Sequence, residues 1–200
     1  LQLLGCPISK KWQIPKILSG IMFMKAVEKK GIAAELDKIP PMSDPDKLWA
    51  IDILADLFKY AYFSGMQNLV AVVVFKSFQW SLKFGRNPKV SMFLAQVGML
   101  ATLIGEAQIG RSYVDQAVIE TQKETSGSLK CAFALHTYSL AWHWTRDVDS
   151  NNLFEGYLAG VKAGSVENAG WDIFLCLQHR CYTGYPLKHL KEDLVKFGHQ

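Results

Sequence analysis

The sequence lacks the features that mark secreted, membrane and nucleic-acid-binding proteins. Its four cysteines (Cys6, Cys131, Cys176 and Cys181) are irregularly spaced, and a chain of 200 residues does not need disulfides. The uncharged run from Val90 to Gly105 is shorter than the roughly 20 residues of a membrane span, so we interpret it as a buried helix. The N-terminus does not show the basic start and following apolar segment that are typical of a signal peptide. We therefore expect a reduced, cytoplasmic protein without a membrane span.

Clustered charge and the common catalytic motifs are absent as well. The net charge is only +4, and the lysines are scattered, so no basic block indicates binding to nucleic acid or anionic lipid. The sequence contains no Gly-x-x-x-x-Gly-Lys-Ser/Thr phosphate loop, no kinase His-Arg-Asp or Asp-Phe-Gly set and no Gly-x-Ser-x-Gly nucleophile elbow. We expect no cofactor and no catalytic residue in this segment.

The composition provides enough apolar residues for a buried core. Half of the residues are hydrophobic and a fifth are charged, which is typical of globular proteins. The length suffices for one domain or one run of helical repeats. The chain begins at Leu1 rather than at methionine, and we expect it to be a segment of a larger protein.

Residues 1–42 are predicted to form a helical lead-in and a connector. Helical spacing of apolar residues predicts a helix from about Ile14 to Lys30, and a short helix from Ile32 to Asp37 can follow. The pair Pro40-Pro41 excludes a helix there and indicates an irregular connector.

A repeat of helix pairs follows the connector. The first predicted pair consists of a helix capped by Ser43 or Asp44 and a second helix from Gln67 to Phe84. Asn87, Ser126 and Ser165 are candidate caps of three later helices, each 39 residues after the one before (126 − 87 and 165 − 126). Each of these apolar helices is followed by a more polar one.

This period predicts an all-α fold. The expected architecture is a right-handed array of antiparallel helix pairs, a tetratricopeptide-like α-α superhelix whose usual period of about 34 residues is lengthened here. The predicted pairs span 43–85, 87–124, 126–164 and 165–198.

Small residues recur at fixed places in these pairs. Gly98, Ala134 and Gly170 lie where we expect helices to cross closely, and a bulky residue there should cost about 1–3 kcal/mol by overpacking. Gly164, Gly184 and Pro186 lie in the predicted joints between helices. We interpret all six as structural repeat positions.

Two histidines and two tryptophans are the first candidates for a ligand-contacting site. His136 and His143 lie seven residues apart on one predicted helix face, where they could be metal ligands or, with no partner at ligand spacing, core or groove residues. Trp142 and Trp144 could form a stacking edge for a ligand or pack between helices.

Two further clusters have ordinary structural explanations. Cys176, His179 and Cys181 are close in sequence, but Cys181 falls off the helix face that the other two share and no Cys-x-x-Cys pair is present. Asp147 and Asp149 could act as an acid pair or be exposed turn residues, and nothing near them indicates a tuned pKa. We expect no metal site.

Short motifs from Leu3 to Leu190 resemble one protein family. They are Ile39-Pro40-Pro41-Met42-Ser43-Asp44-Pro45, Ala61-Tyr62, Leu82-Lys83-Phe84-Gly85, Ala95 with Gly98, Gly105 with Gly110, His143-Trp144, Gly156-Tyr157, Gly164, Glu167, Ala169 and Gly184-Tyr185-Pro186-Leu187. The chain resembles the tetratricopeptide-like helical region of large predicted-ATPase (AAA-type) multi-sensor signal transduction kinases. In that family a protein-kinase-like domain and an ATPase precede the helices, and sensor domains and often a histidine kinase follow. Ser165, where the family usually has Asp, and Trp171, where the aromatic is shifted, depart from its pattern.

The resemblance implies a function in binding. We expect a non-catalytic scaffold or regulatory segment that contacts a protein partner or the neighbouring ATPase and kinase domains, with ATP used elsewhere in the parent protein. One alternative is an all-α enzyme whose pocket is lined by His136, His143 and the tryptophans. A purely structural spacer is the other alternative.

Overall fold

All regular secondary structure in the described residues is helical. The computed structural model describes residues 1–8, 13–141 and 150–197, and the only pairing of strand type in these ranges is an isolated bridge between Pro41 and Arg86. The prediction of an all-α fold is confirmed. The helices are α1 (Gln13–Lys30), α2 (Ile32–Asp37), α3 (Pro45–Phe63), α4 (Gln67–Phe84), α5 (Val90–Leu103), α6 (Ala107–Gln122), α7 (Gly127–Ala141), α8 (Ser150–Ala163), α9 (Val166–Tyr182) and α10 (Leu187–Phe197).

The chain divides into two compact units. The first unit comprises Leu1–Ala117 and the second Val118–Gln200, so the division falls within α6 and not at a predicted repeat boundary. Each predicted segment between 43 and 198 contains two of the helices. The superhelical stacking of these pairs stays a prediction.

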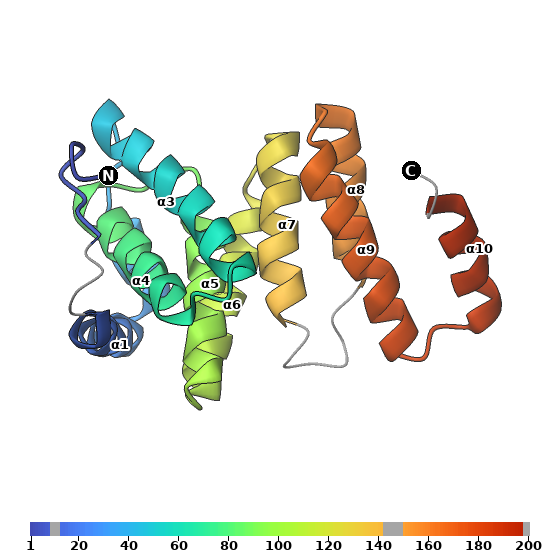
Figure 1. The fold of residues 1–200 in the computed structure, drawn as a ribbon, viewed down its shortest axis with the longest axis horizontal. Coiled ribbons are helices and arrows are strands. Elements are labelled where there is room, and N and C mark those ends of the chain that lie inside the picture. Colours follow the sequence, from blue (N-terminus) through green and yellow to red (C-terminus); the bar gives the residue numbers. More distant parts are fainter. Residues whose placement is uncertain (9–12, 142–149, 198–200) are drawn as a thin grey trace. The chain divides into compact units, whose positions relative to one another are not determined.

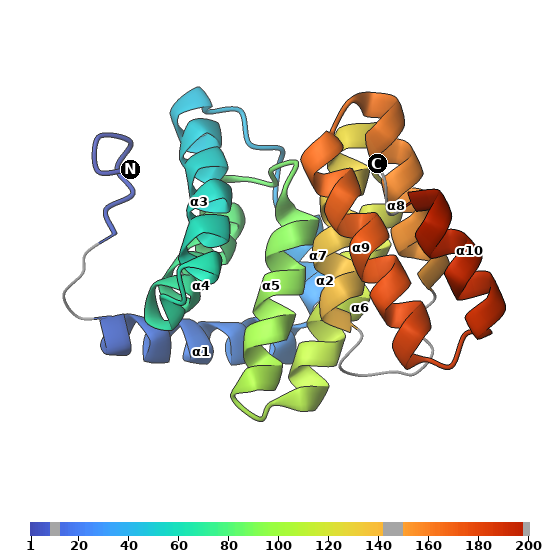
Figure 2. The same cartoon turned by 45° about the vertical axis from the view of Figure 1, so that its right-hand side comes forward.

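Aromatic side chains join three helices in the core of the first unit. Helix α1 lies across α4 (Figure 2), and the approach is so close at Gly20 that a Cβ there would lie 2.3 Å from Cγ of Phe75. The Phe78 ring packs edge-on against Tyr113 of α6, with 5.5 Å between centroids. The Tyr113 hydroxyl donates a hydrogen bond of 2.8 Å to the carbonyl oxygen of Met24. Because this phenol is buried, its pKa is raised, and it serves as a structural donor.

Helix α5 is buried on every side. All twelve residues from Val90 to Ala101 are buried, in agreement with the interpretation of the uncharged run as a core helix. Gly98 lies where α5 meets α6: a Cβ there would be 2.6 Å from Cγ2 of Val114 and 2.8 Å from the carbonyl oxygen of Gly110. Only a residue without a side chain fits this contact.

The structure shows different outcomes for three of the predicted caps, at Asp44, Asn87 and Ser165. Asp44 caps α3, since its Oδ1 accepts hydrogen bonds from the backbone N–H of Asp46 and Lys47. Asn87 lies two residues before the cap position of α5, where its Oδ1 accepts a hydrogen bond of 2.9 Å from the Lys89 N–H. Ser165 occupies the cap position of α9, but its side chain makes no capping hydrogen bond.

In the second unit, α7, α8 and α9 lie side by side and α10 follows (Figure 1). Two glycines of α8 permit this packing. A Cβ on Gly156 would lie 2.5 Å from both the Ala134 Cβ and the Asp172 Oδ2, and a Cβ on Gly160 would lie 2.4 Å from the Cys131 Sγ. The absence of side chains at these two positions therefore lets α8 pack closely against α7 and α9.

Candidate binding surface

Helix α9 has a buried face and an exposed apolar face. Its buried face, towards α7 and α8, contains Ala169, Asp172, Ile173, Cys176 and Leu177. On the other side, Val166 is 77 % exposed, Phe174 54 % and Trp171 37 %. Large apolar side chains that remain exposed side by side on one helix are typical of a contact surface for another molecule.

A shallow hollow of about 450 Å³ lies on this exposed face. It is lined by Val166, Glu167, Gly170, Trp171 and Phe174, which we call the α9 surface. The indole of Trp171 and the ring of Phe174 meet edge-on, with 6.0 Å between centroids and 84° between planes. This arrangement presents two aromatic rings at one wall of the hollow.

Gly170 is part of the hollow and not a helix crossing. A Cβ at this position would meet no atom within 4 Å, so the expected close approach at Gly170 is wrong. The reason is orientation: α9 turns the neighbouring Ala169 and Asp172 towards the unit interior, and position 170 lies outside that face. The missing side chain leaves the hollow open.

A buried carboxyl group lies on the opposite face of α9. Asp172 is fully buried, and its Oδ2 accepts a hydrogen bond of 3.3 Å from the thiol of Cys131 on α7. Its Oδ1 has no hydrogen-bond partner among the described residues. Burial raises the pKa of Asp172 to about 8 despite the opposing effect of the thiol, and burial beside this carboxyl raises the pKa of Cys131. The carboxyl is therefore mostly protonated at neutral pH.

Arg180 connects α9 to the helices on both sides. Its Nη1 donates to Asp193 Oδ2 of α10 at 2.7 Å, and its Nε donates to the Ser150 Oγ of α8 at 3.3 Å. The guanidinium also lies over the rings of Phe154 and Tyr185, at 5.7 and 5.0 Å from their centroids. The side chain is only 11 % exposed, so this charge is held in a largely desolvated site.

Loss of these contacts should destabilise the second unit. We expect Arg180→Ala to lower the free energy of unfolding by about 2–3 kcal/mol, because Asp193 and Ser150 lose a charged donor and two rings lose a packing partner. Denaturant titration measures the change. As a control, Arg111→Ala removes an exposed ion pair with Asp115 and should cost less than about 0.5 kcal/mol. Equal losses in the two variants would contradict the structural role of Arg180.

The predicted histidine and tryptophan site is only partly within the described residues. His136 is half-buried on α7. Trp142, His143 and Trp144, together with Asp147 and Asp149, lie outside the described residues. The predicted pocket therefore stays a hypothesis.

The other structural repeat positions lie as follows. Ala134 is buried against Gly156 of α8. Gly164 and Gly184 follow α8 and α9 with positive φ, and Pro186 precedes α10.

The cysteine and histidine residues near the end of α9 serve different roles. Cys176 is buried and donates from its thiol to the carbonyl oxygen of Ser150 at 3.3 Å, whereas Cys181 is exposed. His179 is buried. In the described part of the chain, no three His, Cys, Asp or Glu side chains are grouped so that they could hold a metal ion.

Sequence reasoning missed Asp172, Arg180 and the spacing of Gly156 and Gly160. A usable signal was present for the first of these: Asp172 lies within the apolar stripe formed by Ala169, Ile173 and Cys176. A charged residue within such a stripe indicates either a buried polar group or an error in the assigned face.

Comparisons with known proteins do not assign this chain to a family. No protein-family model, curated protein or solved structure matches it. None of the helices in the described ranges is long and apolar enough to cross a membrane.

Proposed function

We propose that this chain is a non-catalytic helical-repeat segment that acts by binding protein, with the α9 surface as its contact. The observation that carries the proposal is the exposure of Trp171 and Phe174 beside an open hollow. Aromatic residues, and tryptophan above all, are enriched among the residues that dominate binding energy at protein interfaces. A soluble partner with an apolar helix or loop would fill the hollow and cover both rings.

Helix α9, which carries this surface, is fixed by contacts with three neighbouring helices. Its inner side is packed against α7 and α8 through Gly156 and Gly160, and Arg180 joins it to α10. A surface on a rigid element needs little reorganisation on binding, which favours affinity. The packing of the buried face of α9 thus favours a binding role for the residues on its exposed face.

The partner that we propose is the neighbouring ATPase region of a signal transduction ATPase-kinase, within a tetratricopeptide-like superhelix in the cytoplasm. This part of the proposal is supported by the resemblance in sequence described above and by the all-helical fold. Coupling of nucleotide state to kinase output would require two arrangements of the helices with different affinities for the ATPase.

Paired aromatic substitutions test the proposed surface. The 200-residue chain and the region encoded immediately before it are expressed separately, and their affinity is measured by calorimetry. We expect Trp171→Ala/Phe174→Ala to weaken binding at least 100-fold, since each ring is expected to contribute about tenfold or more. A matched control, Trp49→Ala/Tyr60→Ala, removes a Trp and a Tyr that are 65 % and 66 % exposed on α3. Equal weakening by both pairs, or no binding by the wild-type chain, would contradict the proposal.

A further inference from the structure

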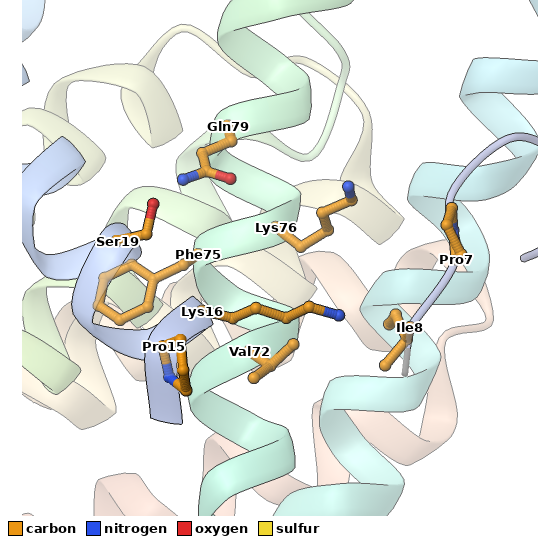
Figure 3. A pocket seen from close by; sticks show the side chains of 9 residues that line it. All are labelled: Pro7, Ile8, Pro15, Lys16, Ser19, Val72, Phe75, Lys76 and Gln79. Atoms are coloured by element: carbon orange, nitrogen blue, oxygen red, sulfur yellow. The ribbon is translucent and has the colours of Figure 1, made fainter. Parts of the chain in front are cut away.

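A second hollow lies in the first unit, between α1, α4 and the N-terminal segment (Figure 3). Its volume of about 270 Å³ lies just below the usual range for drug-sized ligands, so it suits a small molecule. Pro7 and Ile8 of the N-terminal segment form one side, and Pro15 of α1 and Val72 of α4 form the apolar part of the other.

Two lysines give this hollow its charge. The side chains of Lys16 on α1 and Lys76 on α4 both extend towards Pro7 and Ile8 (Figure 3). None of the described residues that line the hollow is acidic. Within the described ranges neither ammonium is paired with a carboxylate. Lys76 Nζ lies over the Trp80 ring, at 5.4 Å from its centroid. The site therefore has positive charge that the described residues do not neutralise.

Two observations near the hollow agree with this charge distribution. Lys47 Nζ lies 5.3 Å from the Trp80 ring centroid, so that ring contacts two lysines. Burial raises the pKa of the Cys6 thiol, while Lys76 and Lys47 act in the opposite direction, as cations near a thiol do. The surroundings favour an anion over a cation or a neutral group.

Two polar side chains that line the hollow add neutral hydrogen-bonding capacity. The Ser19 hydroxyl and the Gln79 side-chain amide both line the hollow, on the α1 and α4 sides respectively (Figure 3). A carboxylate or phosphate oxygen can accept from a hydroxyl and an amide as well as from ammonium groups. The apolar side chains below them can cover only a compact hydrocarbon body.

We propose that this hollow binds a small organic anion, a carboxylate or phosphate monoester on a compact apolar body, with Lys16 and Lys76 holding the anionic group. The two ammonium groups provide charge-assisted hydrogen bonds, and Val72, Pro15 and Ile8 contact the hydrocarbon. The site lies in the first unit and the α9 surface in the second, so each proposal can fail without the other.

A titration with matched probes tests this site. Phenylacetate, phenyl phosphate and the neutral phenylacetamide are titrated into the 200-residue chain, and the methyl NMR signals of Ile8 and Val72 report binding. We expect both anions to bind with a dissociation constant of about 1 mM or lower, an affinity that roughly ten non-hydrogen atoms can supply. Phenylacetamide should bind at least tenfold more weakly, and binding of the anions should weaken as salt is added.

Charge-removing variants distinguish this site from general attraction to a basic surface. Lys16→Gln/Lys76→Gln should weaken anion binding about 100-fold, at about tenfold for each lysine. The control Lys29→Gln/Lys83→Gln removes the same charge from the same two helices outside the hollow and should leave binding within about twofold. Equal losses in the two variants, equal binding of phenylacetamide, or no shift at Ile8 and Val72 with either anion would overturn the proposal. If inorganic phosphate bound as tightly as phenyl phosphate, the apolar part of the proposed ligand would be wrong.

Discussion

Replacing Gly156 with alanine is expected to lower the free energy of unfolding of this chain by about 3 kcal/mol. The result would run against helix propensity, by which alanine is favoured over glycine by about 1 kcal/mol. The reason is geometric: the new Cβ would lie 2.5 Å from the Ala134 Cβ and 2.5 Å from the Asp172 Oδ2. These atoms belong to α7 and α9, so the new methyl group would require α8 to move away from two neighbouring helices at once.

A matched glycine in the next helix provides the control. Gly170→Ala on α9 adds the same methyl group where no atom lies within 4 Å, and it should raise the free energy of unfolding by up to about 1 kcal/mol. Denaturant titrations followed by circular dichroism measure both variants. If both alanines stabilised the chain, the close packing at Gly156 would be contradicted.

Asp172 should make the stability of the second unit depend on pH. Its pKa of about 8 in the folded state lies above the ordinary value of 3.8, so between these values the folded state retains a proton that the unfolded state has released. The resulting stabilisation is fully present below pH 3.8 and is lost as the pH rises through 8. We expect the free energy of unfolding to fall by about 1.4 kcal/mol per pH unit in this window from this group alone.

The variant Asp172→Asn removes the titrating group and should remove most of that slope. It should also be more stable than the wild-type chain near pH 8, where the wild type must bury an ionised carboxylate without a cationic partner. Urea titrations at pH 5, 6, 7 and 8 provide the comparison, with the exposed Asp115→Asn as a control that keeps the slope. Parallel slopes in the wild-type chain and Asp172→Asn would show that the carboxyl is solvated.

Local sequence signals placed the helices well. The apolar period and the glycines that follow helices are properties of a single segment, so Gly164 and Gly184, with φ of 73° and 82°, could be recognised without knowledge of the fold. The cap at Asp44 is equally local, because its partners are two and three residues away. For the same reason the uncharged run of α5 was identified as a core helix.

Contacts between distant helices could not be predicted in the same way. Gly98, Ala134 and Gly170 occupy equivalent places in the sequence pattern, but only the structure shows that position 170 of α9 points away from its neighbours. Asp172 is buried, and the thiol that donates a hydrogen bond to it belongs to Cys131, 41 residues earlier. Hydropathy alone assigns such a carboxyl to the surface, so a prediction from hydropathy leaves Asp172 out of the buried face of α9. The exposed aromatic face of the same helix is also not predicted.

The central claim is that Trp171 and Phe174 of the α9 surface contact a protein partner. Hydroxyl-radical footprinting tests it directly. Side-chain oxidation is measured in the 200-residue chain alone and in the longer protein in which we propose that an ATPase region adjoins this chain. The proposal predicts strong protection of Trp171 and Phe174 in the longer protein and unchanged oxidation of Trp49, which is exposed on α3. Equal oxidation of Trp171 and Phe174 in the two samples would contradict it.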